Sequence, residues 1–313
     1  MKIFALKYDA PSVARVFNLG DDVQTLAASR LLPRLDGYVP RDSLHEVNEP
    51  CVVSMNGFFM GSKNWPPSPL IEPLFYAFHI SPRSKDVVCS PAGLQYLKSK
   101  EPIGCRDQGT ARLLQSHGID AYYSKCVTLT FERRQEPPRN GRVFMVGGAS
   151  KGLFSIVPKS IRKEAVVVNQ SKVQLPDIPH ETRLALARQL LEVYKTHASL
   201  VITSKIHCAM PCIAMGIPVV FLYDHGKHQD YRVDIVKDFV PINHIRDDWL
   251  HQKMINPRLS GRIDWEPKPV DMEEEKNRIR AGYLEAFKRA QTRYEARFCS
   301  APQPEIAAQD TKQ

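Results

Sequence analysis

The chain has 313 residues, of which 43% are hydrophobic and 25% are charged. This is the composition of a globular protein, and it excludes a chain that is disordered over most of its length. Every apolar run is shorter than the roughly 18 residues that a membrane-spanning helix requires. Lys and Arg outnumber Asp and Glu by 43 to 34, a net charge of +9, which attracts phosphates, carboxylates and anionic lipids without selecting among them.

The first part of the chain alternates short apolar runs with helical patterns, which indicates an open α/β domain with parallel strands. We expect a strand over residues 2–8, a glycine turn at 18–22 and a helix over 23–32. Further strands are expected over residues 51–55, 74–80, 103–105 and 121–123, with a helix over 107–117. The polar, proline-containing segment 132–142 is typical of a linker, so the first domain is expected to cover residues 1–135.

A second α/β set follows and predicts a domain over residues 140–265. Its expected strands cover residues 143–146, 165–168, 200–203 and 217–223, and its expected helices cover 180–197 and 206–215. Apolar side chains recur at helical spacing over residues 272–298, which predicts one long C-terminal helix as a separate element over 270–298. The composition of residues 300–313 is typical of a disordered tail.

Seven cysteines are scattered through the chain, most of them in apolar segments. The odd number and irregular spacing indicate reduced thiols that pack as small hydrophobic residues. Cys208 and Cys212 lie beside His207, but no second Cys/His cluster completes a closed zinc site. The first residues lack the apolar core and the cleavage pattern of a signal peptide, so we expect a cytoplasmic protein.

Ligands of open α/β sheets bind at the carboxyl ends of the strands, and three polar side chains follow one expected strand, 200–203. Ser204, Lys205 and His207 place a hydroxyl, an ammonium and an imidazole at a helix start, where backbone N–H groups are unpaired. This combination is suited to a phosphate or carboxylate. The alternative is that Ser204 caps the helix, Lys205 is solvated and His207 is a satisfied buried histidine.

Arg106 leaves the expected strand 103–105, and Asp107 occupies the capping position of the next helix. A guanidinium can hold a carboxylate or phosphate through two parallel hydrogen bonds, which a lysine cannot do. A surface ion pair between Arg106 and Asp107 explains the same pattern.

The basic loop after strand 217–223 contains Lys227. Lys227 can reach over an anion bound at His207. An ordinary exposed loop is the alternative.

Asn18, Gly20, Asp21 and Asp22 lie at the start of the first expected helix. The glycines of a dinucleotide fingerprint and the Lys-Ser/Thr pair of a phosphate-binding loop are missing, which argues against nicotinamide and ATP. Two adjacent carboxylates can bind sugar hydroxyls or act as a base, although capping by Asp21 explains the same pattern. The loop that begins at Asn56 adds aromatic residues of the kind that stack on sugars, so we include Asn56 among the acceptor-binding candidates.

Four motifs follow one another along the chain. They are Asn18-x-Gly20-Asp21-Asp22, Gly104-Cys105-Arg106-Asp107-x-x-Thr110, the run Ser124 to Thr130, and Thr203-Ser204-Lys205-Ile206-His207 with Ala214 to Val219. Together they resemble the polysaccharide pyruvyl transferase family over about residues 10–230. The resemblance implies two Rossmann-like open parallel-sheet domains that face each other across a cleft, as in GT-B glycosyltransferases, with the last helix packed back across the first domain.

The family moves the enolpyruvyl part of phosphoenolpyruvate onto sugar hydroxyls, and the resemblance implies that Arg106, His207 and Lys227 serve this donor. Ser204 and Lys205 belong to the same motif. The family usually has Ser-Arg-x-His where this chain has Ser-Lys-Ile-His, so the grip on the anion differs in shape.

As a hypothesis, Arg106, Lys205 and Lys227 neutralise the donor's carboxylate and phosphate, and His207 acts as acid or base. Protonation of the enol methylene creates an oxocarbenium-like carbon, one sugar hydroxyl adds, phosphate leaves, and a second hydroxyl closes a cyclic pyruvate ketal. Asp21 or Asp22 deprotonates or orients the acceptor. We expect no metal and no cofactor in this reaction, because side chains supply the neutralising charge.

Two other functions stay open, a GT-B glycosyltransferase that uses a nucleotide sugar and an inactive protein of polysaccharide assembly. Nucleic-acid binding is not expected, because the positive charge is spread along the chain without a basic run. Seven Lys or Arg between residues 276 and 297 would let the last helix rest on an anionic membrane near a lipid-linked acceptor. The alternative is that these side chains form a solvated face.

Overall fold

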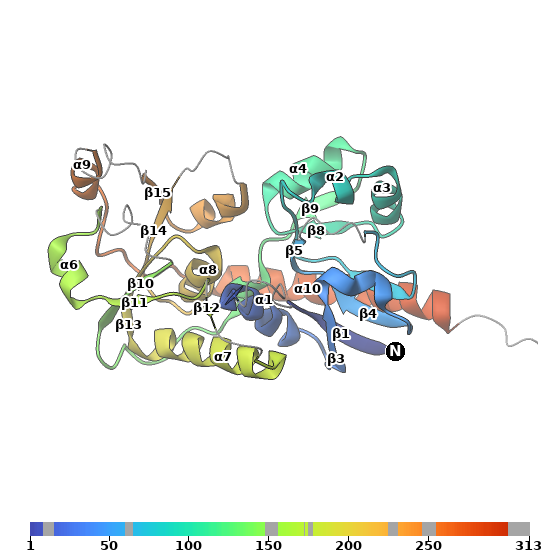
Figure 1. The fold of residues 1–313 in the computed structure, drawn as a ribbon, viewed down its shortest axis with the longest axis horizontal. Coiled ribbons are helices and arrows are strands. Elements are labelled where there is room, and N and C mark those ends of the chain that lie inside the picture. Colours follow the sequence, from blue (N-terminus) through green and yellow to red (C-terminus); the bar gives the residue numbers. More distant parts are fainter. Residues whose placement is uncertain are drawn as a thin grey trace, which may run out of the picture.

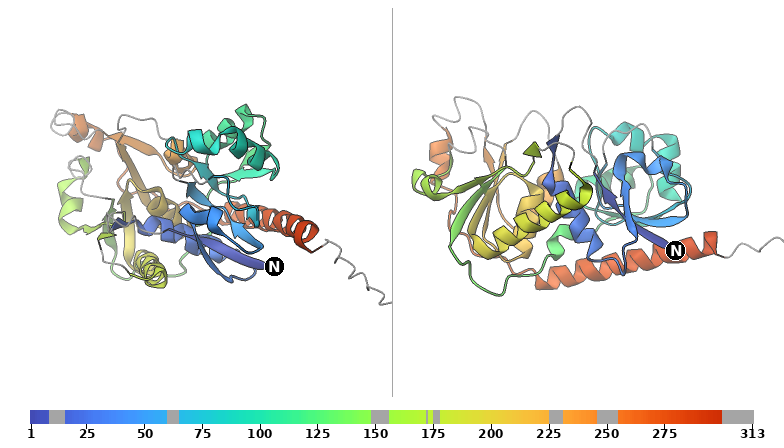
Figure 2. Two further views of the ribbon diagram at one scale, coloured as in Figure 1. Left: turned by 45° about the vertical axis from the view of Figure 1, so that its right-hand side comes forward. Right: turned by 60° about the horizontal axis from the view of Figure 1, so that its bottom comes forward.

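The structure, a computed structural model, describes residues 1–8, 16–59, 65–147, 156–171, 173–174, 178–224, 231–245 and 255–299. Two α/β domains lie side by side, and one long helix runs along the first of them (Figures 1 and 2). The predicted fold class, two domains with open parallel sheets and a long C-terminal helix, is confirmed. The tail expected over residues 300–313 lies outside the described residues.

The first domain contains two four-stranded parallel sheets that continue into each other. Their strand orders are β3-β1-β4-β6 and β5-β7-β8-β9. The strands are β1 Lys2–Lys7, β3 Gly37–Pro40, β4 Cys51–Ser54, β5 Gly57–Phe59, β6 Ile71–Leu74, β7 Phe78–Ile80, β8 Ile103–Cys105 and β9 Ala121–Tyr123. Backbone hydrogen bonds from Met55 N to Leu74 O and from Gly57 N to Ala77 O join the two sheets.

One predicted strand of this domain is wrong in its extent. The run expected as a single strand over residues 74–80 forms β6 and β7, because the chain kinks at Ala77, where φ is +57°. The neighbouring strand breaks at the same level, between β4 and β5. Both breaks lie at the end of the sheet where the candidate residue Asn56 is found.

The helices of the first domain pack against its strands and at the junction with the second domain. They are α1 Leu19–Ser29, α2 Lys85–Val88, α3 Pro91–Lys98 and α4 Gln108–Ser116, with short 3-10 turns η1 Arg41–Glu46 and η2 Val127–Thr130. Helix α1 begins before the predicted residue 23, because the Asn18 side chain caps it by accepting a hydrogen bond from Gly20 N at 3.0 Å. Asp21 is therefore not the cap.

The second domain has one five-stranded parallel sheet in the order β11-β10-β13-β14-β15. The strands are β10 Arg142–Val146, β11 Val166–Val168, β13 Ala198–Thr203, β14 Val219–Asp224 and β15 Ile242–Ile245. The helices are α6 Lys159–Glu164, α7 His180–His197, α8 Ile206–Ala214 and α9 Asn256–Ser260, with the 3-10 turn η3 Tyr231–Asp238. Strand β15 was not predicted, because Asn243 and His244 interrupt its apolar pattern.

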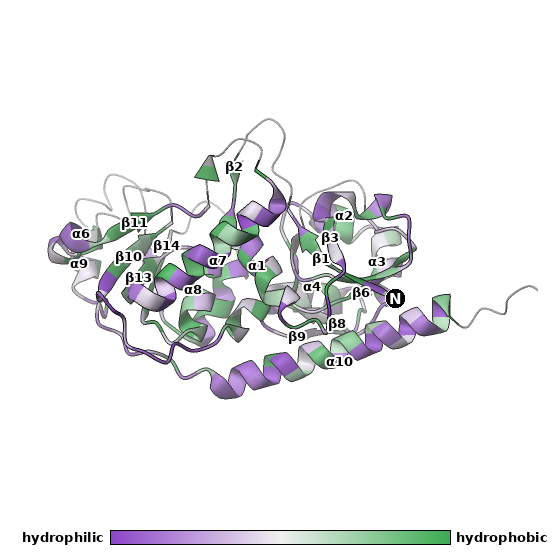
Figure 3. Cartoon of the chain, turned by 90° about the horizontal axis from the view of Figure 1, so that it is seen from below, coloured by the Kyte–Doolittle hydropathy of each residue, from purple (hydrophilic) through white to green (hydrophobic). Residues whose placement is uncertain are grey.

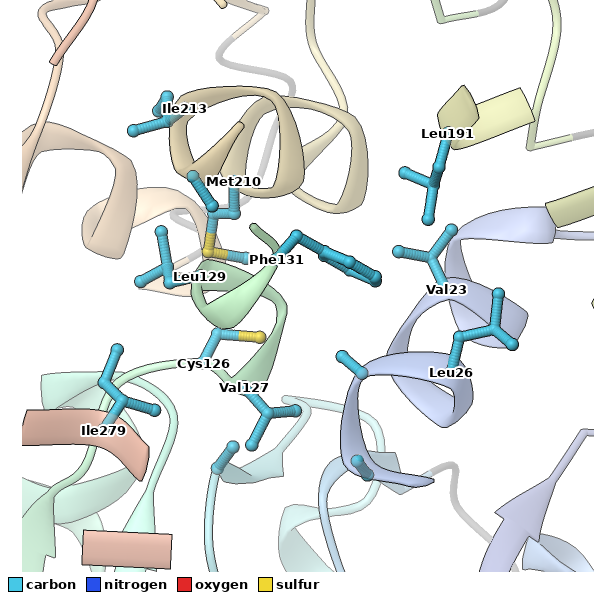
Figure 4. Close-up of a cluster of buried hydrophobic side chains, with 14 of the residues drawn as sticks. Val23, Leu26, Cys126, Val127, Leu129, Phe131, Leu191, Met210, Ile213 and Ile279 are labelled. Atoms are coloured by element: carbon cyan, nitrogen blue, oxygen red, sulfur yellow. The ribbon is translucent and has the colours of Figure 1, made fainter. Parts of the chain in front are cut away.

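The two domains are joined in three ways. The expected linker carries no helix or strand between Phe131 and Gly141. A short antiparallel ladder pairs β2 Val16–Phe17 with β12 Val173–Gln174. A shared apolar core runs through the junction, where Val23 and Leu26 of α1 lie near Leu191 of α7 (Figure 4). The domains are therefore one packed unit at their junction.

Helix α10, Glu273–Phe298, follows both domains in the chain and packs back on β4, β6 and η2 of the first domain. Its apolar stripe is buried, including Ile279, Tyr283 and Ala290, and the remaining positions give the helix a mostly hydrophilic outer face (Figure 3). Among the described helices, α10 included, none is both long and apolar enough to cross a membrane.

An acidic side chain on the sheet holds α10 in place, and its removal gives a first prediction. Glu72 on β6 is 1% exposed and accepts hydrogen bonds from Lys100 Nζ at 2.6 Å and from Arg293 Nε of α10. Glu72→Gln leaves the buried Lys100 and the partly exposed Arg293 without their counter-ion, so we expect the free energy of unfolding to fall by about 3 kcal/mol. Urea denaturation measures this loss.

The matched control is Glu274→Gln, which removes an exposed carboxylate of α10 that pairs with Arg278 on the same helix. It should leave the urea midpoint nearly unchanged. Equal midpoints for the wild type and Glu72→Gln would show that Glu72 does not anchor α10.

Candidate functional site

The starts of α1 and α8, one from each domain, meet where the strands of both sheets end. A side chain carbon at Gly20 would lie 3.2 Å from Cβ of His207, a tight contact, so glycine here favours the close approach of the two helices. Gln170 joins the same two helices, because its carbonyl oxygen accepts from Leu19 N at 2.8 Å and its Nε2 donates to His207 O at 3.3 Å. The structure therefore brings the first and last of the four motifs together.

Arg106 follows β8 and is completely buried. Its Nη1 donates to Gln24 Oε1 at 3.4 Å, and its Nε lies 3.9 Å from Asp107 Oδ2. Neither Nε nor Nη2 makes a hydrogen bond to any residue that the structure describes. Because Arg106 and Asp107 are both 0% exposed, the surface ion pair considered above is not what the sequence pattern encodes. A buried guanidinium with unused donors is suited to an incoming anion.

Asp107 connects Arg106 to a histidine that the sequence analysis did not select. Its Oδ1 accepts from Thr110 N at 2.8 Å and caps α4, and its Oδ2 lies 2.6 Å from Nδ1 of His79. Burial opposes ionisation of Asp107, but the His79 hydrogen bond and the charge of Arg106 hold its pKa below the usual value. The ionised carboxylate only accepts, so Nδ1 of His79 donates.

His79 and His207 are both buried beside the Arg106 charge. Burial, followed by the charge of Arg106, lowers the pKa of His79 to about 4. The same two causes hold the pKa of His207 well below its usual value. Because its pKa is lowered, His207 is a neutral imidazole at pH 7. Its Nε2 has no hydrogen-bond partner in the described part of the chain, so this nitrogen is available to a ligand.

Ser204 does not cap helix α8, although this role was considered for it. Helix α8 begins at Ile206 with Lys205 at the capping position, and no side chain caps it. Ser204 Oγ lies 2.9 Å, and Lys205 Cε 3.5 Å, from the place a Cβ would take at Gly147, where β10 has just ended. Both side chains therefore lie along the end of the second sheet.

The two carboxylates at the start of α1 have different surroundings. Asp22 is fully buried and forms an ion pair with Arg183 of α7 at 3.0 Å. Burial raises the pKa of Asp22 to about 6, against the opposing effect of Arg183. Asp21 is partly exposed, burial also raises its pKa, and its Oδ1 accepts from Gln24 Nε2 at 3.2 Å. Of the two, Asp21 is the one placed to reach a ligand.

Gln24 and Tyr8 complete the surroundings of Arg106, and neither was predicted. Gln24 bridges Asp21 and Arg106 through its side-chain amide. A Cβ at Gly57, where φ is +101°, would lie 2.6 Å from Tyr8 OH and 2.9 Å from Gln24 Oε1, so this position needs glycine. Tyr8 OH is buried without a hydrogen-bond partner among the described residues.

The remaining predicted residues are placed as follows. Asn56 is 1% exposed, donates to Gln24 O at 3.3 Å and accepts from Ser54 Oγ at 3.0 Å, so its amide is engaged inside the first domain. Lys227 lies outside the described residues. No group of three or more His, Cys, Asp or Glu side chains in the described ranges is arranged to hold a metal ion.

Sequence reasoning missed residues for identifiable reasons. Tyr8 directly follows β1, which is the signal that selected Arg106, but it was not singled out. His79 lies inside β7, in the apolar run 74–80, where nothing marks it as a site residue. Gln24 is inside a helix, and Gln170 and Arg183 act across the domain junction. Nothing in the local sequence marks a residue whose partner comes from the other domain.

The fold and the site define a two-domain α/β protein with a buried, incompletely paired cation between its helix starts. The chain belongs to the polysaccharide pyruvyl transferase family, whose model matches residues 18–226. No curated protein sequence matches the chain. A solved structure described as a putative UDP-N-acetylglucosamine 2-epimerase from Listeria monocytogenes is similar with a TM-score of 0.44 and 10% identity, covering 92% of this chain and 97% of that one.

The neutral state of His79 gives a prediction for pH dependence. The unfolded chain binds a proton on this imidazole below pH ~6.5, whereas the folded protein does so only near the lowered pKa of about 4. The contribution of His79 to stability is therefore complete above pH ~6.5 and is lost as the pH falls toward 4. From pH 7 to 5 this loss is about 2 kcal/mol.

The test compares wild type with His79→Asn, which keeps a donor for Asp107 but does not titrate. Urea unfolding at pH 7 and pH 5 should show a smaller drop in stability for the variant. Comparing the two proteins cancels the contribution of Asp22, whose raised pKa acts in the opposite direction in this range. An identical drop in both proteins would contradict a neutral His79.

Proposed function

We propose that the protein transfers the enolpyruvyl group of phosphoenolpyruvate to two hydroxyls of a saccharide, forming a cyclic pyruvate ketal and releasing phosphate. Family membership gives the general class, a transferase of polysaccharide synthesis. The observation that carries the choice of donor is the buried Arg106 guanidinium, with Nε and Nη2 unpaired among the described residues. A buried cation is costly without an anion, and phosphoenolpyruvate brings both a carboxylate and a phosphate.

The remaining donor contacts follow the motif order of the chain. Ser204 and Lys205 lie at the end of the second sheet, and Lys227 comes three residues after β14, Val219–Asp224, in the sequence. We propose that Lys205 and Lys227 neutralise the phosphate while Arg106 grips one anionic group bidentately. Lys205 replaces the arginine that is usual in the family, so its contact is a point charge and not a fork.

His207 is the proposed proton carrier, and its environment explains how it becomes charged. In the free protein its pKa is far below the usual value, because it is buried and faces the Arg106 charge. A bound trianion raises that pKa. Donor binding therefore loads the proton onto His207 at neutral pH and places it beside the group it must protonate.

The proposed chemistry balances without a metal or cofactor. The proton from His207 bonds to the enol methylene carbon, and an acceptor oxygen bonds to the adjacent carbon. The bond from that carbon to the phosphate oxygen breaks, and the second hydroxyl oxygen closes the ketal. Of the two hydroxyl protons released, one returns to His207 and the other leaves with phosphate.

Asp21 is our candidate for orienting or deprotonating the acceptor. It is partly exposed and is linked to Arg106 through Gln24. Asp22 pairs with Arg183 across the junction, so we propose that it positions the start of α1. Asn18 and Gly20 form the first turn of α1. The Asn56 amide stabilises the same helix by donating to Gln24 O.

Thermal melting with candidate donors tests this proposal. Phosphoenolpyruvate at ~100 times its dissociation constant should stabilise the wild type by about 2.7 kcal/mol, whereas UDP-glucose should not. Arg106→Ala and His207→Ala should abolish the shift, and Arg106→Lys, which keeps the charge but loses the fork, should reduce it. Arg139→Ala, an exposed arginine of the linker, is the matched control and should respond like wild type.

Two outcomes would replace the proposal. A shift with UDP-glucose alone would identify a GT-B glycosyltransferase that uses a nucleotide sugar. No shift with either compound would favour an inactive protein of polysaccharide assembly.

The contacts of α10 bear on whether the protein meets a lipid-linked acceptor at the inner face of a membrane. Three of its basic side chains donate to atoms of the first domain, Arg280 to Thr130 O, Arg289 to Tyr122 OH and Arg293 to Pro73 O. Lys276 is buried. Four of the seven basic residues of the helix are therefore bonded to the first domain or buried, which argues against a basic surface free to rest on a membrane.

We therefore expect the protein to stay in the bottom fraction when it is mixed at low salt with phosphatidylglycerol vesicles and subjected to flotation. Recovery with the vesicles, lost again in the double variant Lys288→Glu/Arg297→Glu, would contradict this expectation and establish contact with anionic lipid.

A further inference from the structure

A pocket that shares no lining residue with the site above lies between α1 and α7. Its volume is about 460 Å³, which is within the range of roughly 300 to 1,000 Å³ found for small-molecule sites. Its apolar part includes Leu26, Phe131, Leu191 and Met215. Figure 4 shows Leu26 and Phe131 approaching the same space as Leu191 from three separate elements.

Some charged side chains of the pocket have hydrogen-bond or ion-pair partners among the described residues, and others have none. Arg30 forms an ion pair with Glu132 at 2.9 Å and lies over the Phe131 ring. Glu192 accepts from the hydroxyl of Thr196 at 3.0 Å. Arg188 and Lys195, both on α7, have no hydrogen-bond or ion-pair partner within the described ranges. The α7 wall thus presents two cations and one carboxylate, Glu192, a net positive charge beside an apolar surface.

Ser29 on the opposite wall adds an independent sign of an incomplete site. Its hydroxyl oxygen is buried and has no hydrogen-bond partner among the described residues. Helices α1 and α8 end at this pocket, and their last carbonyls carry partial negative charge. An anionic group is therefore favoured at the α7 wall, and a hydroxyl or other donor group at the α1 wall.

The pocket and the site are the opposite ends of the same three helices. Helix α1 carries Asp21 at its start and Leu26 and Ser29 toward its end. The whole helix, 11 residues, is about 16 Å long. Helix α8 carries His207 near its start and is followed by Met215. Helix α7 pairs with Asp22 through Arg183 and supplies Arg188, Leu191 and Lys195 further on.

We propose that this α1–α7 pocket binds a small amphipathic phosphate free in solution, and that its occupancy is felt at the site through α1, α7 and α8. The apolar part of the ligand packs on Leu26, Phe131 and Leu191, and its phosphate pairs with Arg188 and Lys195. A ligand in this position braces the two domains at the junction that also holds His207 against Gly20.

Calorimetric titration of the full chain with n-octyl phosphate, below its micelle concentration, tests the binding. We expect one site, with inorganic phosphate and octanol each binding at least tenfold more weakly. The double variant Arg188→Glu/Lys195→Glu should weaken binding at least tenfold, and Arg188→Ala/Lys195→Ala should weaken it less. The matched control Arg162→Glu/Lys163→Glu makes the same charge change on α6, away from the pocket, and should bind like wild type.

Three results would overturn the binding site. They are no saturable binding to the wild type, equal binding to the Arg188→Glu/Lys195→Glu variant, and loss of binding in Arg106→Ala, which would place the ligand in the site already described. None of these depends on whether phosphoenolpyruvate is the donor.

Hydrogen exchange tests the coupling. Octyl phosphate should slow amide exchange over residues 19–22 and 206–209 in the wild type but not in Arg188→Glu/Lys195→Glu. Protection limited to residues that line the pocket would overturn the coupling and leave a simple binding site.

Discussion

The arrangement of this protein depends on a single helix, α1, that is buried on nearly every side. Nine of its residues, from Leu19 to Ala28, are buried, whereas a surface helix buries only one stripe. Small residues at 20, 27 and 28 let neighbours approach closely, and the hydroxyl of Thr25 satisfies Leu6 O at 2.7 Å. Helix α1 packs on β1 of the first domain and on α7 and α8 of the second. Its position therefore fixes how the sheets of the two domains are placed relative to each other, and how the start of α1 meets the start of α8.

The electrostatics of the site follow from that placement. Closing the junction removes water from Arg106, His79 and His207 together, and the resulting low dielectric makes every charge more expensive. One carboxylate, Asp107, is kept ionised by its neighbours, and the imidazoles are kept neutral. In the free protein the charge of Arg106 is therefore only partly compensated by Asp107. An anionic ligand would relieve this unfavourable electrostatic energy, and a neutral ligand would not.

The sequence was sufficient for features that depend on local patterns. Most of the parallel strands, α7 and α10 follow from apolar periodicity, and the segments around Arg106 and His207 follow from polar residues placed at strand ends. It was insufficient where two distant segments determine a feature together. The kink at Ala77 reflects pairing across two sheets, and the roles of Gln170 and Arg183 exist only because the domains meet. His79 was missed because its neighbours in sequence are apolar, and Gln24 was missed because it lies inside a helix.

The return of α10 to the first domain has a consequence for how the chain folds during synthesis. Strands β4 and β6 are made early, but the helix that covers them and the arginine that reaches Glu72 are made only after the whole second domain has emerged. Until then, the apolar face of β4 and β6 and the carboxylate of Glu72 are exposed to solvent. The nascent first domain is therefore expected to remain incomplete and prone to association on the ribosome, with the last helix acting as the closing step of folding.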